Sequence, residues 1–160
     1  MASGKRRVAV SLNQGKETTE LAMDRGKILH PGYSLTCIIP SDTNPRRPDL
    51  NHAGVRLDKV KALAKRPDED RDAFQARIED WIDNQSLSSE AADVWRHLMT
   101  LALSIHESRG VIQPVTVRVA SHDASTATLI AGERRFLASW LAGLDGIDAI
   151  VRTTDDPSLH

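Results

Sequence analysis

A glycine followed by three charged residues has the composition of an anion-binding turn. Gly132 ends an expected strand, and Glu133, Arg134 and Arg135 begin an expected helix. A glycine at such a junction lets the backbone turn sharply and lets a ligand approach the main chain. The helix start offers unpaired N–H groups and the positive end of a dipole, and two guanidinium groups add fork-shaped donors that suit phosphate oxygens. The same residues also suit an ordinary solvated helix start, so the turn alone leaves both interpretations open.

The elements that must hold this turn follow from the spacing of apolar residues. Between residue 69 and Gly110 the apolar residues recur at helical spacing, at 115–119 they alternate with polar ones, and after Gly132 the helical spacing returns. Residues 1–32 show no sustained period and predict a flexible arm, whereas residues 33–160 predict one α+β domain with a small mixed sheet and helices. The expected elements are strands at 8–12 and 33–40, a loop at 41–51, helices at 56–65, 69–84 and 88–108, strands at 115–119 and 127–131, a helix at 133–142 and a strand at 147–151.

Charge is distributed unevenly along the 160 residues, although the formal net charge is only −1. Residues 1–66 carry 13 Lys and Arg against six Asp and Glu, whereas residues 67–107 carry three against ten. The basic part suits a polyanion, with Lys5, Arg6 and Arg7 as candidate DNA contacts, and the acidic part would repel one. Because phosphate contacts carry no base information, we expect only non-specific DNA binding from this chain.

Other kinds of site are excluded by their missing signatures. The sequence has no apolar run long enough to cross a membrane, no signal peptide, no P-loop and no G-x-S-x-G motif. The six histidines include no i, i+4 pair and no cysteine partner, and Cys37 is the single cysteine. We therefore expect no metal site built from these side chains, and a cytoplasmic protein.

The order and spacing of three motifs resemble the N-terminal domain of ParB partition proteins. These motifs are S-I-H-E-S-R-G-V-I-Q-P-V-T-V-R at 104–118, A-G-E-R-R-F-L-A-S-W-L-A-G-L at 131–144 and I-D-A-I-V at 147–151. Upstream, N-P-R-R at 44–47 is similar to the arginine segment of the family, in the form found in partition-like proteins of integrating conjugative elements.

The resemblance implies a ParB/sulfiredoxin-like fold that binds a nucleoside triphosphate, characteristically CTP with Mg²⁺, and hydrolyses it slowly. It also implies a role in the segregation or maintenance of a plasmid, a chromosome or a mobile element, with a ParA-type ATPase as partner, nucleoid association and a homodimer. The residues that match the family's nucleotide site are Gly132, Glu133, Arg134 and Arg135 at the phosphates, Arg46 or Arg47 at the triphosphate, and Gly110 and Gln113 beside the base and ribose.

The sequence departs from the family pattern in three places. Residues 52–90 form a helical insertion, and Leu137 replaces the usual arginine after the Gly-Glu-Arg-Arg-Phe motif. In the family, a later E-N-x-x-R helix supplies the metal ligands, and the sequence ends at His160 before that helix. From these residues alone we expect at most a weak CTPase.

Two alternatives to the partition module remain open. ParB-like folds also occur in proteins credited with nuclease or ATP-dependent phosphotransferase activity, and in such an enzyme Glu133 would be the catalytic base. The other alternative is a degenerate domain without catalysis that binds DNA or protein through its basic segments.

Overall fold

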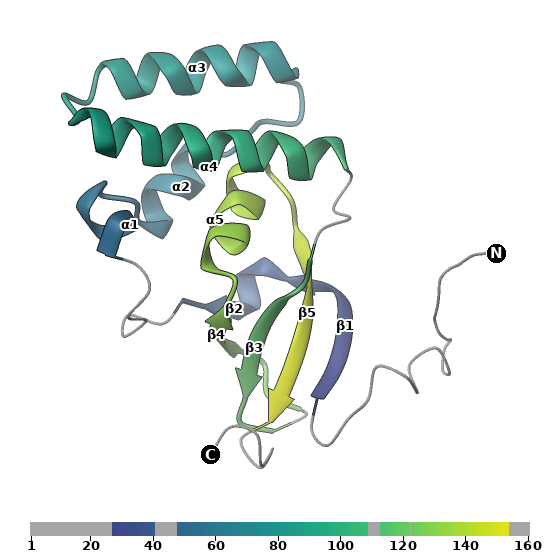
Figure 1. Ribbon diagram of the computed structural model, residues 1–160. Helices are drawn as coiled ribbons and strands as arrows, with labels where there is room; N and C mark the ends of the chain where they lie inside the picture. Colours follow the sequence, from purple (N-terminus) through teal and green to yellow (C-terminus); the bar gives the residue numbers. More distant parts are fainter. Residues whose placement is uncertain (1–26, 41–47, 109–112, 122, 154–160) are drawn as a thin grey trace.

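A five-stranded mixed sheet and a group of helices at one end of it make up the protein in the computed structural model (Figure 1). The structure describes residues 27–40, 48–108, 113–121 and 123–153. Their elements are β1 (Lys27–Ser34), the 3₁₀ helix η2 (Leu35–Cys37), β2 (Ile38–Ile39), α1 (Pro48–His52), α2 (Leu57–Leu63), α3 (Arg71–Asp83), α4 (Ser89–Glu107), β3 (Val115–Val119), β4 (Ala127–Ala131), α5 (Glu133–Leu141) and β5 (Gly146–Thr153).

The strands lie in the order β1-β5-β3-β4-β2, so that β3 is at the centre. β3 pairs antiparallel with β4 and parallel with β5, while β1 is antiparallel to β5 and β2 is parallel to β4. Along β3, Val115, Val117 and Val119 are buried and alternate with the more accessible Thr116 and Arg118. This alternation defines an inward face, toward the core, and an outward face.

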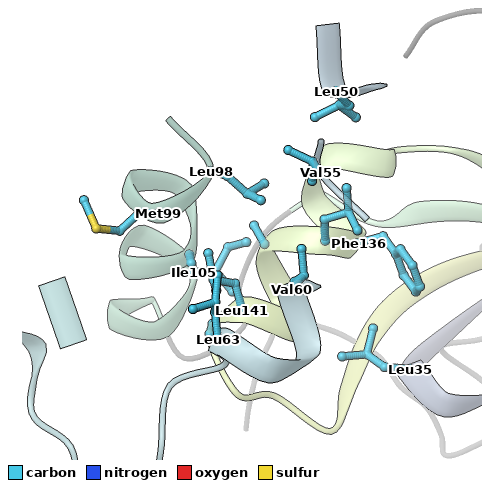
Figure 2. Close-up of a cluster of buried hydrophobic side chains, with 14 of the residues drawn as sticks. Leu35, Leu50, Val55, Val60, Leu63, Leu98, Met99, Ile105, Phe136 and Leu141 are labelled. Carbon is cyan, nitrogen blue, oxygen red and sulfur yellow. The ribbon is translucent and has the colours of Figure 1, made fainter. Parts of the chain in front are cut away.

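The helices share one hydrophobic core with the inward face of the sheet. Figure 2 shows α4 and α5 meeting through side chains such as Leu98, Ile105 and Leu141, with Val60 and Leu63 of α2 beside them. A side-chain oxygen caps the N-terminus of each of the two long helices. At α3 the Asp70 carboxylate accepts a hydrogen bond from the N–H of Ala73, and at α4 the Ser88 hydroxyl accepts one from the N–H of Ala91. α2 and α3 therefore contribute to the same core as α4 and α5.

A part-buried ion pair fixes the turn between α2 and α3. Arg77 Nε lies 2.7 Å from Glu69 Oε2, and Arg77 Nη2 donates to the carbonyl oxygens of Leu63 and Ala64 at 3.1 and 3.2 Å. Nη2 also donates to the other Glu69 oxygen. Only 9% of the Glu69 side chain is exposed. The hydrogen bonds from Arg77 are the main cause that lowers the pKa of Glu69 to about 2.

Most expected elements are confirmed, including the helices expected at 56–65, 69–84 and 88–108, the β3–β4 hairpin and the strand-to-helix junction at Gly132. The side chains of Phe74, Ile78 and Ile82 are buried, as their spacing of four residues in the helix expected at 69–84 predicts. The short strand expected at 8–12 lies outside the described residues.

Three expectations about residues 27–52 are wrong. Residues 27–32, placed in the arm, belong to β1, because they pair with β5 through a register shift between His30 and Tyr33 that accommodates Pro31. The single strand expected at 33–40 is broken by η2, where the N–H of Leu35 donates to the carbonyl of Asp145 at 3.0 Å. Part of the expected loop at 41–51 forms α1, which buries Leu50.

Replacing Glu69 by Gln should lower the free energy of unfolding at pH 7 by about 2 kcal/mol. The part-buried guanidinium of Arg77 would then lose the carboxylate with which it is paired. The pKa of Glu69 is depressed in the folded state, so its contribution is complete above about pH 4.5 and is lost as the pH falls toward about 2. Urea unfolding of both proteins between pH 7 and pH 2.5 should show the difference shrinking below pH 4.5.

The matched control is Asp58→Asn, since Asp58 forms an ion pair with Arg56 in which both side chains are about 70% exposed. This variant should change the free energy of unfolding little at any pH. A Glu69→Gln effect of the same size at pH 7 and at pH 2.5 would contradict the ion-pair assignment.

Candidate anion-binding site

The turn between β4 and α5 is built around a glycine in the left-handed region. Gly132 has φ 92° and ψ 33° and precedes Glu133, the first residue of α5. A Cβ atom at this position would lie 2.9 Å from Cγ1 of Val115 and 3.1 Å from Nη2 of Arg135. Both the backbone conformation and the close packing against β3 therefore require glycine.

The N-terminus of α5 opens at this turn. The first intrahelical hydrogen bond runs from the N–H of Phe136 to the carbonyl of Gly132, at 2.9 Å, and no side chain caps the helix at Gly132. The N–H groups of the first turn precede this bond and find no acceptor within the helix. They carry the positive end of the helix dipole, which favours an anion.

Arg135 folds back across the turn toward the segment that precedes β3. Its Nη1 donates to Oε1 of Gln113 at 3.1 Å, and its Nη2 donates to the carbonyl of Pro114 at 3.3 Å. Its Nε is buried and has no hydrogen-bond partner in the structure. The structure thus brings together three residues that the sequence assigned to the nucleotide site: Gly132, Arg135 and Gln113.

Arg134 points to a different neighbour. Its guanidinium forms an ion pair with the carboxylate of Asp49 in α1, and nearly half of each side chain is exposed. The pair therefore joins α1 to the glycine turn. Sequence reasoning missed Asp49, because a single acid inside a predicted loop carries no periodic or motif signal.

Glu133 is buried, with 8% of its surface exposed, at the first helical position of α5. A carboxylate there interacts favourably with the helix dipole. Its burial limits access for an attacking water, which does not favour the hypothesis of a catalytic base.

The remaining candidate residues from the sequence lie outside the described residues. They are Lys5, Arg6, Arg7, Arg46, Arg47 and Gly110. Within the described ranges, no group of three His, Cys, Asp or Glu side chains is placed to hold a metal ion. Over the same ranges, no helix combines the length and the apolar composition that a membrane span needs.

Comparison with known proteins gives a consistent set of similarities. The family model described as the ParB N-terminal domain matches residues 82–160. A probable chromosome-partitioning protein ParB of Neisseria meningitidis serogroup A is 37% identical over 106 residues, which are 66% of this chain and 30% of the relative. The chromosome-partitioning protein ParB of Caulobacter vibrioides is 34% identical over 103 residues, 64% of this chain and 27% of the relative.

The chain spans less than a third of the length of these curated relatives. Among solved structures, it is similar to the C-terminally truncated chromosome-partitioning protein ParB of Caulobacter crescentus complexed with CTP-gamma-S. That match has 25% identity and a TM-score of 0.38, and it covers 82% of this chain and 46% of the other.

Replacing Gly132 by Ala should destabilise the protein by at least about 2 kcal/mol, through the left-handed backbone and the contact with Val115. Gly32→Ala is the matched control, because Gly32 has φ 63° and nothing within 4 Å of an added Cβ. Gly32→Ala should lower the free energy of unfolding by only about 1 kcal/mol, the cost of the left-handed backbone conformation for alanine. Equal losses of stability for the two variants in urea unfolding would show that Val115 leaves room for a Cβ atom at Gly132.

Proposed function

Because residues 82–160 belong to the ParB N-terminal domain family, we propose that this chain is a partition module that binds a nucleoside triphosphate at the Gly132 turn. The main support for this proposal is that three groups able to bind an anion are close together in the structure. The glycine turn, the N-terminus of α5 and the Arg135 guanidinium with its buried Nε lie together. Such a cradle suits phosphate oxygens, which accept hydrogen bonds from backbone N–H groups and guanidinium groups.

Each site residue has a proposed role. The backbone at Gly132 admits the phosphates closely, and Arg134 and Arg135 contact their oxygens from two sides. Gln113 already contacts Arg135, so the segment before β3 is placed to border the rest of the nucleotide. Arg46 or Arg47, Gly110 and Glu133 complete the proposed set by their match to the family motifs.

CTP is the proposed nucleotide, and the resemblance of the motifs to the ParB family supports that choice. Mg²⁺ would accompany the triphosphate, because this ion prefers phosphate oxygens and keeps several waters. The described side chains do not form a metal site of their own. This chain's part is therefore to bind and orient the phosphates.

The wider role is segregation of a DNA element in the bacterial cytoplasm. The named relatives are chromosome-partitioning proteins, and we extend that role to this chain as part of the proposal. A ParA-type ATPase partner, nucleoid association, a homodimer and non-specific DNA contacts through Lys5, Arg6 and Arg7 belong to the same proposal.

Arg135→Ala and Arg134→Ala should each weaken CTP binding about ten-fold or more, because each removes a charge-assisted contact worth roughly 1.5–3 kcal/mol. Isothermal titration with CTP and Mg²⁺ measures this directly. Arg56→Ala is the control, since Arg56 is an exposed arginine paired with Asp58 at the start of α2. Unchanged affinity in both site variants would place the nucleotide elsewhere.

Asp49→Asn should strengthen CTP binding by up to about five-fold, because the exposed ion pair that competes for Arg134 is worth at most about 1 kcal/mol. In an Arg134→Ala background, the same substitution should have no effect on the dissociation constant. A gain that persists without Arg134 would mean that Asp49 acts through general repulsion of the triphosphate.

A further inference from the structure

A cavity on the inward face of the sheet lies beyond the helices. Figure 1 shows the helices gathered at the end of the sheet where β3 begins, whereas the cavity lies at the end where β3 stops. Val151 is opposite the core residue Val117, and Ile28 is opposite Val151, so the cavity extends the face that carries the core. Its volume is about 220 Å³, and the residues that line it are Ile28, His30, Tyr33, Val119, Ala124 and Val151.

The walls of this cavity are mostly apolar. Apart from His30 and Tyr33, the lining residues are aliphatic. The rings of His30 and Tyr33 meet edge to face with their centroids 4.9 Å apart, and Nδ1 of His30 lies 3.1 Å from the carbonyl oxygen of Pro31. The cavity is smaller than the roughly 300–1,000 Å³ of common small-molecule sites and has few convergent polar groups. It therefore suits the apolar side chains of a polypeptide segment.

The strand that supplies one wall of the cavity is at the edge of the sheet. In the order β1-β5-β3-β4-β2, no strand of the described ranges lies on the outer side of β1. An edge strand offers its backbone as a template for a further strand. Pro31 has no N–H group, and the register of β1 shifts between His30 and Tyr33. The template is therefore confined to the part of β1 before Pro31, which suits a short strand.

The sequence before β1 contains a short segment with the matching pattern. Residues 8–12 read V-A-V-S-L, with Val8, Val10 and Leu12 alternating with two small residues. This alternation predicts a strand with one apolar face. Residues 13–26 connect the segment to β1 and can span up to about 45 Å when extended. That length is ample for the chain to return alongside β1.

We propose that residues 8–12 pair with the outer edge of β1 as a sixth strand and lay their apolar side chains over the cavity. The segment would remove its own apolar face and the aliphatic wall of the cavity from water. The proposal does not depend on nucleotide binding, because Val119 at the cavity and Val115 at the Gly132 turn are at opposite ends of β3.

The same strand would fix the basic segment that directly precedes it. Lys5, Arg6 and Arg7 come immediately before Val8 in the sequence. With residues 8–12 paired to β1, these three cations would be held at the edge of the sheet. The DNA contacts proposed for them would then start from a fixed position on the domain.

A second copy of the chain could donate the same segment, but the chain's own segment is favoured. The connection through residues 13–26 gives it an effective concentration of about the millimolar range, which a separate chain does not reach in dilute solution. The test therefore distinguishes contacts within one chain from contacts between chains.

The test is an NMR experiment on the full chain with ¹³C-labelled valine and leucine methyl groups. Tyr33 is the single tyrosine, so its ring gives one set of signals from the cavity. We expect NOEs from this ring to methyl groups of residues 8–12. Val10→Asp should abolish these NOEs and shift the Tyr33 ring signals, because an ionised carboxylate does not enter an apolar cavity.

Ser11→Asp is the matched control, since it adds the same charge at the neighbouring position, on the other face of the proposed strand. It should keep the NOEs and the Tyr33 signals, and both variants should bind CTP as tightly as the unchanged chain. Absence of NOEs between Tyr33 and residues 8–12, or equal effects of the two Asp variants, would overturn the proposal. NOEs that arise only between labelled and unlabelled chains would overturn it in favour of a second copy.

Discussion

The lack of space beside Gly132, where Val115 would block a Cβ atom, is the constraint on which the turn depends. The turn must adopt φ 92° with no Cβ, because the side chain of Val115 occupies the space where one would stand. That contact fixes where β4 stops and where α5 starts relative to the central strand. It also places the N-terminus of α5 next to the Arg135 guanidinium, whose Nη2 would lie 3.1 Å from a Cβ at Gly132. If the turn at Gly132 were less constrained, Gly132 and Arg135 would not be held next to β3.

The packing of α2 and α3 in the common core supports α4 and α5. The apolar side chains of α2 and α3 join the core that α4 and α5 share, as Val60 and Leu63 show in Figure 2. The hydrogen bonds from Arg77 of α3 to the end of α2 hold these two helices together. α1 then brings Asp49 to Arg134, on the other side of the turn. α5 thus packs against α4, a helix from the acidic part of the sequence.

The sequence predicts what is local and periodic. The alternation at Val115–Val119, the apolar stripe of α4 and the glycine between β4 and α5 each depend on neighbouring residues, and each is confirmed. What it misses depends on distant partners. β1 starts at Lys27 because β5, at the other end of the sequence, pairs with it, and no local period signals that pairing. The Asp49–Arg134 ion pair arises in the same way, because its two residues are far apart in the sequence.

The central claim is that phosphates bind where Gly132, Gln113 and Arg135 meet, and amide chemical shifts test it most directly. In ¹⁵N-labelled protein, CTP with Mg²⁺ should shift the backbone N–H resonances of Gly132 through Arg135 and of Gln113. CMP, which lacks the β- and γ-phosphates, should leave them nearly unchanged at the same concentration. Shifts confined to other segments, or equal shifts with CTP and CMP, would contradict the account.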